Sequence, residues 1–285
     1  MSFSFYVRTA ESGLPSLDTL LEGLDPDVGV VEEGPRDEPL SGTRHVYRSG
    51  LSTRGVCLRV SPEGDLEVLL RSCASREDYA LGVDIVIRAA ALTGAAAEAE
   101  DSEQELEPGQ VQALYRDRWI DEQVHAACDA VVNVTEGSGR VQMSGPTRMF
   151  YLGPRLLGDL RRGGSEDTLW QRLISVMRRV QWPPGRWYPA STMTVKSRTT
   201  RATSTIAVWA PDVAYLFPPV DHLVLTAADG GNDAIAVPYP IAPTIAPDRC
   251  RWLDEAHLVV EKTGLEDWDA LRARAMPYRE DMPPK

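Results

Sequence analysis

The sequence contains no run of apolar residues long enough to cross a bilayer, which needs about 20 in a row. Its short apolar start, residues 1–7, has no basic residues before it and is followed at once by Arg8 and Glu11, so it lacks the pattern of a secretory signal. Only four cysteines occur among 285 residues, and none of them forms a CxxC pair. We therefore expect a cytoplasmic protein with reduced thiols rather than a disulfide framework.

Common catalytic motifs are also missing. The sequence has no G-x-x-x-x-G-K-[ST] phosphate loop, no G-x-G-x-x-G after a strand, no G-x-S-x-G elbow and no H-E-x-x-H helix. These absences exclude the commonest nucleotide, acyl-transfer and metalloprotease sites, but not an enzyme whose site is assembled from distant residues. Residues 254–257 spell the DEAH box of helicases. Without a phosphate loop we interpret them as a polar turn before a strand at 258–260.

Histidine is scarce too, with four residues in the chain. The only candidate for metal binding lies on a predicted helix, where Asp121, Glu122, His125 and Cys128 are spaced so that their side chains could converge. The other three histidines stand alone, whereas a metal site usually needs a second cluster of ligands. We interpret the helix face as solvated and ion-paired, and we predict no metal and no cofactor.

What is present is an ordinary globular composition, with 43% apolar and 25% charged residues. Alternating and β-branched segments predict strands, bounded by glycine and proline turns. Phe3, Phe5 and Val7 form one apolar face of the first strand. Further strands are predicted at 44–48, 55–60, 66–70, 131–134, 140–143, 148–152, 191–196, 203–209, 222–226, 234–237 and 257–261.

Four helices are predicted from apolar residues at helical spacing and from end signals. The clearest runs from a Ser75 cap to Gly94, with Glu77 and Asp78 in its first turn. A second spans about 110–130, and a third follows a Ser165 cap and stops at prolines 183 and 184. The last begins at Thr263, whose spacing to Glu266 suits a capping box. Prolines 238, 240, 243 and 247 predict an extended, non-helical path between them.

The order of these elements predicts an α+β fold with mixed, mainly antiparallel sheets and about four helices, as one large domain or two closely packed subdomains. Residues 98–107 include six carboxylates among ten residues, which is typical of a solvated linker. We therefore predict a β-rich N-terminal section with one buried helix at 1–95, an acidic linker at 96–108 and a larger α+β section at 109–285.

The net charge of −12 and a pI near 4.9 argue against binding to nucleic acid or to an anionic membrane. They favour a protein partner with a basic surface, or solubility alone. The charge is unevenly distributed, because residues 140–209 hold twelve basic and three acidic side chains. That stretch carries +9, which leaves −21 on the remainder.

Within the basic stretch, residues 191–205 are rich in serine and threonine, and Trp187 and Tyr188 precede them. Guanidinium groups, hydroxyls and aromatic faces together suit a phosphate or carboxylate ligand. The alternative is that these basic residues pair with acidic segments of the same chain. The candidate anion-binding residues are Arg186, Lys196, Arg198 and Arg201.

Two functions of different class remain open. The first is a non-enzymatic cytoplasmic binding protein, an inhibitor whose acidic surface covers a basic partner. A protein with an uneven charge distribution and no catalytic motif resembles, in type, the toxin-neutralising immunity proteins of bacteria. No residue motif carries that resemblance. The second is an enzyme or ligand-binding protein acting on a small anion at the basic Ser/Thr-rich sheet. A structural component of a larger assembly is a third, weaker interpretation.

Overall fold

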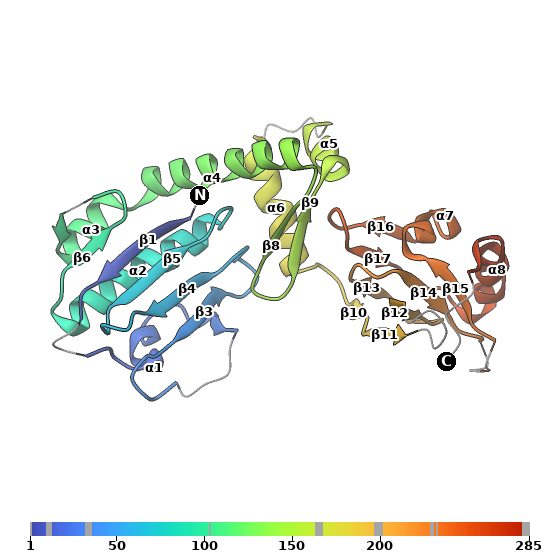
Figure 1. Ribbon diagram of the computed structural model, residues 1–285, viewed down its shortest axis with the longest axis horizontal. Helices are drawn as coiled ribbons and strands as arrows, with labels where there is room; N and C mark the ends of the chain where they lie inside the picture. Colours follow the sequence, from blue (N-terminus) through green and yellow to red (C-terminus); the bar gives the residue numbers. More distant parts are fainter. Residues whose placement is uncertain are drawn as a thin grey trace. The chain divides into compact units, whose positions relative to one another are not determined.

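Two proline residues in succession, Pro183 and Pro184, mark the place where the chain divides. The computed structural model describes residues 2–9, 13–31, 36–102, 104–162, 168–196, 202–228, 231 and 233–280. It contains two compact units, Met1–Pro183 and Pro184–Lys285, which we call unit 1 and unit 2 (Figure 1). Each unit is described by itself below.

Unit 1 is built on a seven-stranded sheet in which every neighbouring pair of strands is antiparallel. Short turns, such as the one at 61–65 between its fourth and fifth strands, explain this arrangement, because consecutive strands joined by tight turns pair antiparallel. In spatial order the strands are β2 (Val28–Val30), β3 (Thr43–Arg48), β4 (Val56–Val60), β5 (Leu66–Leu70), β1 (Phe3–Val7), β6 (Ala97–Ala99) and β7 (Glu105–Leu106).

One face of this sheet is covered by the helix α2 (Arg76–Thr93). Its N-cap is Ser75, whose hydroxyl accepts from the backbone N–H of Asp78, and it ends at Gly94 in the left-handed conformation with φ 67°. The helix approaches the sheet closely at Gly82, where an added Cβ would lie 2.5 Å from Leu70. The alternating apolar residues of β1 and β5 thereby become buried. Full burial of each large apolar side chain stabilises the fold by about 1.5–3 kcal/mol.

The remaining elements of unit 1 are five helices and a hairpin. An aromatic cluster formed by Phe3, Phe5, Tyr115 and Trp119 packs the start of α4 against β1. The hairpin of β8 and β9 packs against α4 and α6. These elements are α1 (Leu17–Leu21), α3 (Pro108–Leu114), α4 (Asp117–Ser138), β8 (Val141–Ser144), β9 (Met149–Leu152), α5 (Pro154–Arg162) and α6 (Leu169–Gln181).

Unit 2 contains two four-stranded sheets that share one buried core with α8 (Leu265–Ala275). Trp209 and Trp268 are fully buried in this core, and Trp268 Nε1 donates to the carbonyl of Thr226 at 2.9 Å. One sheet is β10 (Tyr188–Pro189), β13 (Tyr215–Phe217), β17 (Leu258–Val260) and β16 (Cys250–Trp252); the other is β11 (Thr192–Lys196), β12 (Thr203–Trp209), β14 (His222–Leu225) and β15 (Ile235–Pro238).

The α+β class is confirmed, but the expected number of about four helices is wrong, because the described residues contain eight α-helices. The expected helix at 110–130 is two helices, α3 and α4, separated at Tyr115 and Arg116. The short helices α1, α5 and α7 (Ala242–Ile245) were not predicted, since four to nine residues show too few turns for a helical period. No helix in the described ranges is long and apolar enough to span a membrane.

Two predicted segments have the opposite secondary structure. Residues 131–134 are helical rather than extended, because α4 continues to Ser138 and buries residues at helical spacing, which outweighs the strand preference of valine. Within 238–247, Pro238 is extended as the end of β15, but residues 239–245 form the 3₁₀ turn η1 (Tyr239–Ile241) and α7. Pro240 and Pro243 stand in the first turn of each, where a proline costs no hydrogen bond.

The predicted helix caps had different outcomes. Ser75 caps α2 as predicted. Thr263 does not cap α8, because Gly264 is the N-cap and the side chain of Thr263 is buried. Ser165 lies outside the described residues, and α6 begins after Thr168, which forms a capping box with Gln171.

Residues 96–108, expected as an acidic linker, contribute β6 and β7 to the sheet of unit 1. Ala97 and Ala99 are buried, and the carboxylate of Glu98 pairs with Arg8 at 2.7 Å. Alanine alternates with glutamate here because successive side chains of a strand point to opposite faces of the sheet, alanine to the buried face and glutamate to the other. A count of carboxylates does not reveal this alternation.

Candidate functional site

Of the four basic residues predicted as an anion site, the structure describes two, Arg186 and Lys196. Arg186 is exposed and precedes β10, whereas Lys196 is exposed and ends β11, a strand of the other sheet of unit 2. Arg198 and Arg201 lie outside the described residues. Neither Arg186 nor Lys196 lines the two hollows described below.

Several arginines of the basic stretch 140–209 are held by other groups of unit 1. Arg161 and Arg162 form ion pairs with Glu136 and Asp159, and Arg178 lies 2.6 Å from Glu77. This pairing favours the alternative interpretation of that stretch, in which its charges meet acidic residues of the same chain.

The predicted metal-ligand types on α4 do not converge. His125 is exposed and its Nε2 lies 3.1 Å from Asp129, whereas the side chain of Cys128 is buried. A hydrogen bond with Cys73, together with burial, raises the pKa of the Cys128 thiol. Among the residues that the structure describes, no group of three metal-ligating side chains exists.

The DEAH sequence forms a buried turn. Asp254 Oδ1 accepts from the backbone N–H groups of Ala256 and His257 at 2.8 and 2.7 Å, and Oδ2 lies 3.0 Å from His257 Nδ1. The interpretation of these residues as a polar turn before β17 is confirmed.

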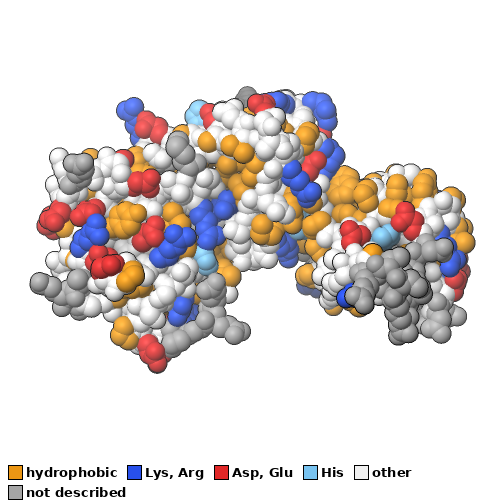
Figure 2. All heavy atoms as spheres, in the orientation of Figure 1, with side chains coloured by type: hydrophobic (Ala, Val, Ile, Leu, Met, Phe, Trp, Pro, Cys, Tyr) orange, Lys and Arg blue, Asp and Glu red, His pale blue; other side chains and the backbone are white. Residues whose placement is uncertain are grey.

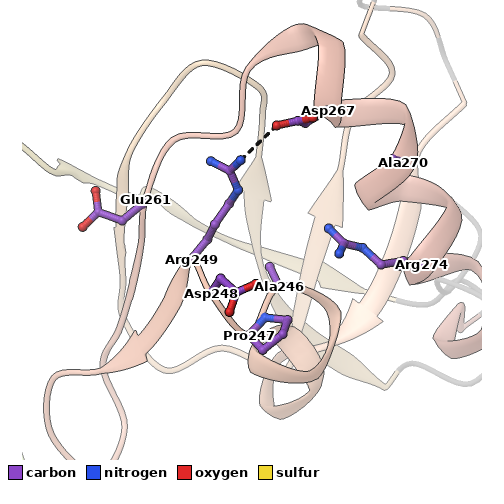
Figure 3. Close-up of a pocket in the computed structure, with 8 residues that line it drawn as sticks. All are labelled: Ala246, Pro247, Asp248, Arg249, Glu261, Asp267, Ala270 and Arg274. Carbon is purple, nitrogen blue, oxygen red and sulfur yellow. Dashed lines mark hydrogen bonds and ion pairs between the residues drawn. The ribbon is translucent and has the colours of Figure 1, made fainter.

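A hollow of about 570 Å³ in unit 2 is lined by α8 and the segment after α7 (Figure 3). Arg249 points toward Asp267 and pairs with it at 3.0 Å, and it also donates to the carbonyl of Lys262. With Arg274 there are two cations in the lining, against the three carboxylates of Asp248, Glu261 and Asp267. The charges of the lining nearly cancel, so we place no site there.

A smaller pocket of about 240 Å³ in unit 1 has a different chemistry. We call it the Arg54–Arg71 pocket. It lies where β3, β4 and β5 approach the β8–β9 hairpin, and Figure 2 shows basic side chains beside a histidine in this part of the surface. Its lining residues are Val31, His45, Val46, Arg54, Gly55, Arg71, Ser144, Gly145 and Pro146, with no acidic side chain among them.

Arg71 connects two walls of the pocket. It follows β5, and its Nη1 donates to Ser144 Oγ at 3.0 Å. Its Nη2 lies 3.1 Å from His45 Nδ1 and 3.3 Å from Nε2. Since a guanidinium group only donates hydrogen bonds, an imidazole nitrogen of His45 is the acceptor in a hydrogen bond with Arg71.

Arg54 forms the opposite wall, in the loop before β4. Its Nη1 donates to the carbonyl of Ser72 at 3.0 Å, whereas its Nε is buried and has no partner in the described part of the chain. Burial, and to a smaller extent the charge of Arg71, lowers the pKa of Arg54 to about 10. Among the described residues no carboxylate forms an ion pair with Arg54 or Arg71.

The loop that carries Arg54 is fixed from below by Asp78. This buried carboxylate accepts from the backbone N–H groups of Thr53, Arg54 and Ser75 at 2.9–3.0 Å. The hydroxyl of Thr53 donates to the carbonyl of Cys73 at 2.9 Å, which ties the loop to the segment after β5. Two loops far apart in sequence are thus held side by side beneath the pocket.

The wall of the pocket that the β8–β9 hairpin forms is held in place by Gln181, at the end of α6. Gln181 Oε1 accepts from the backbone N–H groups of Thr147 and Arg148 at 3.0 Å, and Nε2 donates to the carbonyl of Arg148 at 2.9 Å. Gly145 lies against this amide, because a Cβ there would be 2.3 Å from Gln181. The turn next to Ser144 is therefore rigidly positioned.

These residues were missed by the sequence reasoning, although one signal was present. In an antiparallel hairpin the start of the first strand lies beside the end of the second, and Val56 pairs with Leu70. Arg54 before β4 and Arg71 after β5 therefore meet at the same edge. His45 and Ser144 required the tertiary structure, because they come from elements that no local pattern connects.

No protein-family model, no curated protein and no solved structure matches this chain. The fold and the pocket define an α+β chain of two units with a cationic pocket in the first.

Proposed function

We propose that this protein binds a small anion in the Arg54–Arg71 pocket of unit 1. The observation that carries the proposal is the meeting of two guanidinium groups in one pocket without a carboxylate in its lining. Burial of cations is costly unless they are paired, and an anionic ligand offsets that cost. The pocket is also built on fixed elements, as a binding site requires, because Asp78 and Gln181 hold two of its walls.

The choice of this pocket over the predicted set at Arg186, Lys196, Arg198 and Arg201 rests on convergence. Arg71 Nη1 and Nη2 reach Ser144 and His45 in the same pocket that Arg54 lines. For the predicted set, two of the four residues lie outside the described part; of the other two, Arg186 precedes β10 of one sheet and Lys196 ends β11 of the other.

The test is to purify the tagged chain from its native host and to identify anions released on denaturation by mass spectrometry. We expect the wild-type chain to release one class of anion in stoichiometric amount, and the Arg71→Gln variant to release little or none. Arg44→Gln is the matched control: Arg44 precedes His45 on β3, it does not line the pocket, and its replacement changes the net charge equally.

Equal recovery of the anion from the Arg71→Gln and wild-type chains would contradict the proposal. So would a chain that, after purification without competing anions, shows no stabilisation by any small anion in thermal unfolding. A bound ligand at about 100 times its Kd stabilises a protein by about 2.7 kcal/mol, which such a scan detects readily.

The acidic charge supports a second proposal, that the protein covers a basic protein partner as an inhibitor or immunity-type protein, or takes part in a larger assembly. Of the net charge of −12, residues 184–285 carry −2 (11 basic and 13 acidic side chains), which leaves −10 on residues 1–183. Affinity purification at low and at high salt tests it. A stoichiometric basic partner that is lost at high salt supports the proposal, and the absence of any stoichiometric partner at low salt contradicts it.

A further inference from the structure

We infer that the ligand of the Arg54–Arg71 pocket is a tetrahedral dianion, namely a phosphate group. This inference rests on the proposed function, which requires only that some small anion binds there. Three properties of the pocket lead to it: its charge, the directions of its donors and its volume.

The charge of the pocket matches a dianion. Arg54 and Arg71 both line it, and no acidic residue does. With the pKa of Arg54 lowered only to about 10, both guanidinium groups are charged at neutral pH. A monoanion would neutralise one of these two charges, whereas a phosphate or sulfate dianion neutralises both.

The donors that line the pocket come from three separate elements. Arg54 precedes β4, Arg71 follows β5 and Ser144 ends β8. Each guanidinium group has five N–H donors, and the contacts of Arg54 with Ser72 and of Arg71 with Ser144 and His45 use only some of them. Ser144 Oγ accepts from Arg71, which leaves its own hydrogen free to donate to the ligand.

This arrangement suits a tetrahedral group better than a carboxylate. A single carboxylate is planar, and one guanidinium fork can bind both of its oxygens. A phosphate presents more oxygens, in several directions, so that donors from the β4, β5 and β8 sides can be used at once. A lone carboxylate has only two oxygens, in one plane, to share between two guanidinium groups and the Ser144 hydroxyl.

The volume limits what else enters the pocket. About 240 Å³ is below the range of roughly 300–1,000 Å³ that holds drug-sized ligands. The anionic group itself therefore occupies the pocket, either as inorganic phosphate or as the phosphate end of a small ester whose remainder lies outside.

The experiment is isothermal titration of the full chain at constant ionic strength with anions that separate charge from geometry. Phosphate and sulfate are tetrahedral dianions, malonate is a dianion with planar carboxylates, and acetate is a planar monoanion. We expect phosphate and sulfate to bind about tenfold or more tightly than malonate and acetate, since only the tetrahedral ions use all donors. Methyl phosphate distinguishes a phosphate ester from inorganic phosphate as the natural ligand. Tighter binding of methyl phosphate than of phosphate identifies an ester, and weaker binding identifies inorganic phosphate.

Variants locate the binding. We expect Arg71→Gln to weaken phosphate binding about tenfold or more, and Arg71→Lys to weaken it too, because lysine keeps the charge but loses the fork. Circular dichroism establishes that both variants are folded, and Arg44→Gln binds as the wild type does.

Binding of malonate or acetate as tight as that of phosphate would overturn the inference but leave the proposed function intact. Failure of all four anions to bind overturns both, and unchanged phosphate binding by folded Arg71→Gln removes the pocket as the site.

Discussion

At the scale of single residues, the buried carboxylate of Asp78 connects several segments of unit 1. It has no exposed surface, and one of its oxygens accepts from three backbone N–H groups and lies 3.2 Å from the hydroxyl of Thr53. Through Thr53 and Arg54 it holds the loop before β4, and through Ser75 it holds the start of α2. One carboxylate therefore links the capping of a helix to the geometry of the pocket.

We predict that Asp78→Ala destabilises the protein by about 3 kcal/mol or more, since buried N–H groups of Thr53, Arg54 and Ser75 lose their acceptor. Urea unfolding followed by circular dichroism measures the change. Asp27→Ala is the control: Asp27 is exposed, so its replacement changes the stability by no more than about 0.5 kcal/mol. A loss of similar size in both variants would show that Asp78 has no special structural role.

At the scale of secondary-structure elements, the β8–β9 hairpin depends on a helix that follows it in sequence. The end of α6 supplies Gln181, whose amide replaces the backbone partners that the turn at 145–148 lacks. Gly145 is required there because the amide occupies the space of a side chain. The position of one wall of the pocket is therefore decided by the packing of α6.

We predict that Gly145→Ala destabilises unit 1 by about 1–3 kcal/mol, because the new methyl group displaces the Gln181 amide, and that it weakens anion binding at the same time. Gly137→Ala is the matched control. Gly137 lies within α4 with open space around its Cα, so alanine is expected to stabilise the helix by up to about 1 kcal/mol. Thermal unfolding with and without phosphate measures both effects, and normal stability and binding in Gly145→Ala would contradict this account.

At the scale of the whole molecule, each unit has a core of its own. Unit 1 buries the apolar faces of its sheet against α2, and unit 2 buries Trp209, Phe217 and Trp268 between its two sheets and α8. Unit 1 also carries most of the acidic excess, with a net charge of −10 against −2 for unit 2. The anion pocket is therefore a local cationic site within an acidic unit, and its affinity depends on close contacts rather than on long-range attraction.

We predict that residues 1–183 and residues 184–285 each fold when expressed alone, because each buries a sheet without the other. Circular dichroism, and the fluorescence of Trp209 and Trp268 in the second fragment, measure this. Fragment 1–183 should bind phosphate with the affinity of the full chain. A fragment that stays unfolded, with fully solvated tryptophan emission, would show that the unit is not independent.

The sequence by itself determined the α+β class, the hairpin of β4 and β5 and the limits of α2, because these depend on alternation, turn residues and caps that act over a few positions. It also determined that Arg54 and Arg71 flank that hairpin. Local patterns failed at 131–134 and 239–245. At 131–134 burial along one side of α4 outweighed the strand preference of valine, and at 239–245 the prolines fit the first turn of a helix.

Only the tertiary structure decided which polar groups come together. His45, Arg54, Arg71 and Ser144 derive from four places in the chain, and their meeting depends on the pairing of β3 with β4 and on the packing of the β8–β9 hairpin. The acidic segment at 96–108 likewise became part of a sheet because β1 had an edge to pair with. Such contacts connect residues tens of positions apart, and no short-range preference encodes them.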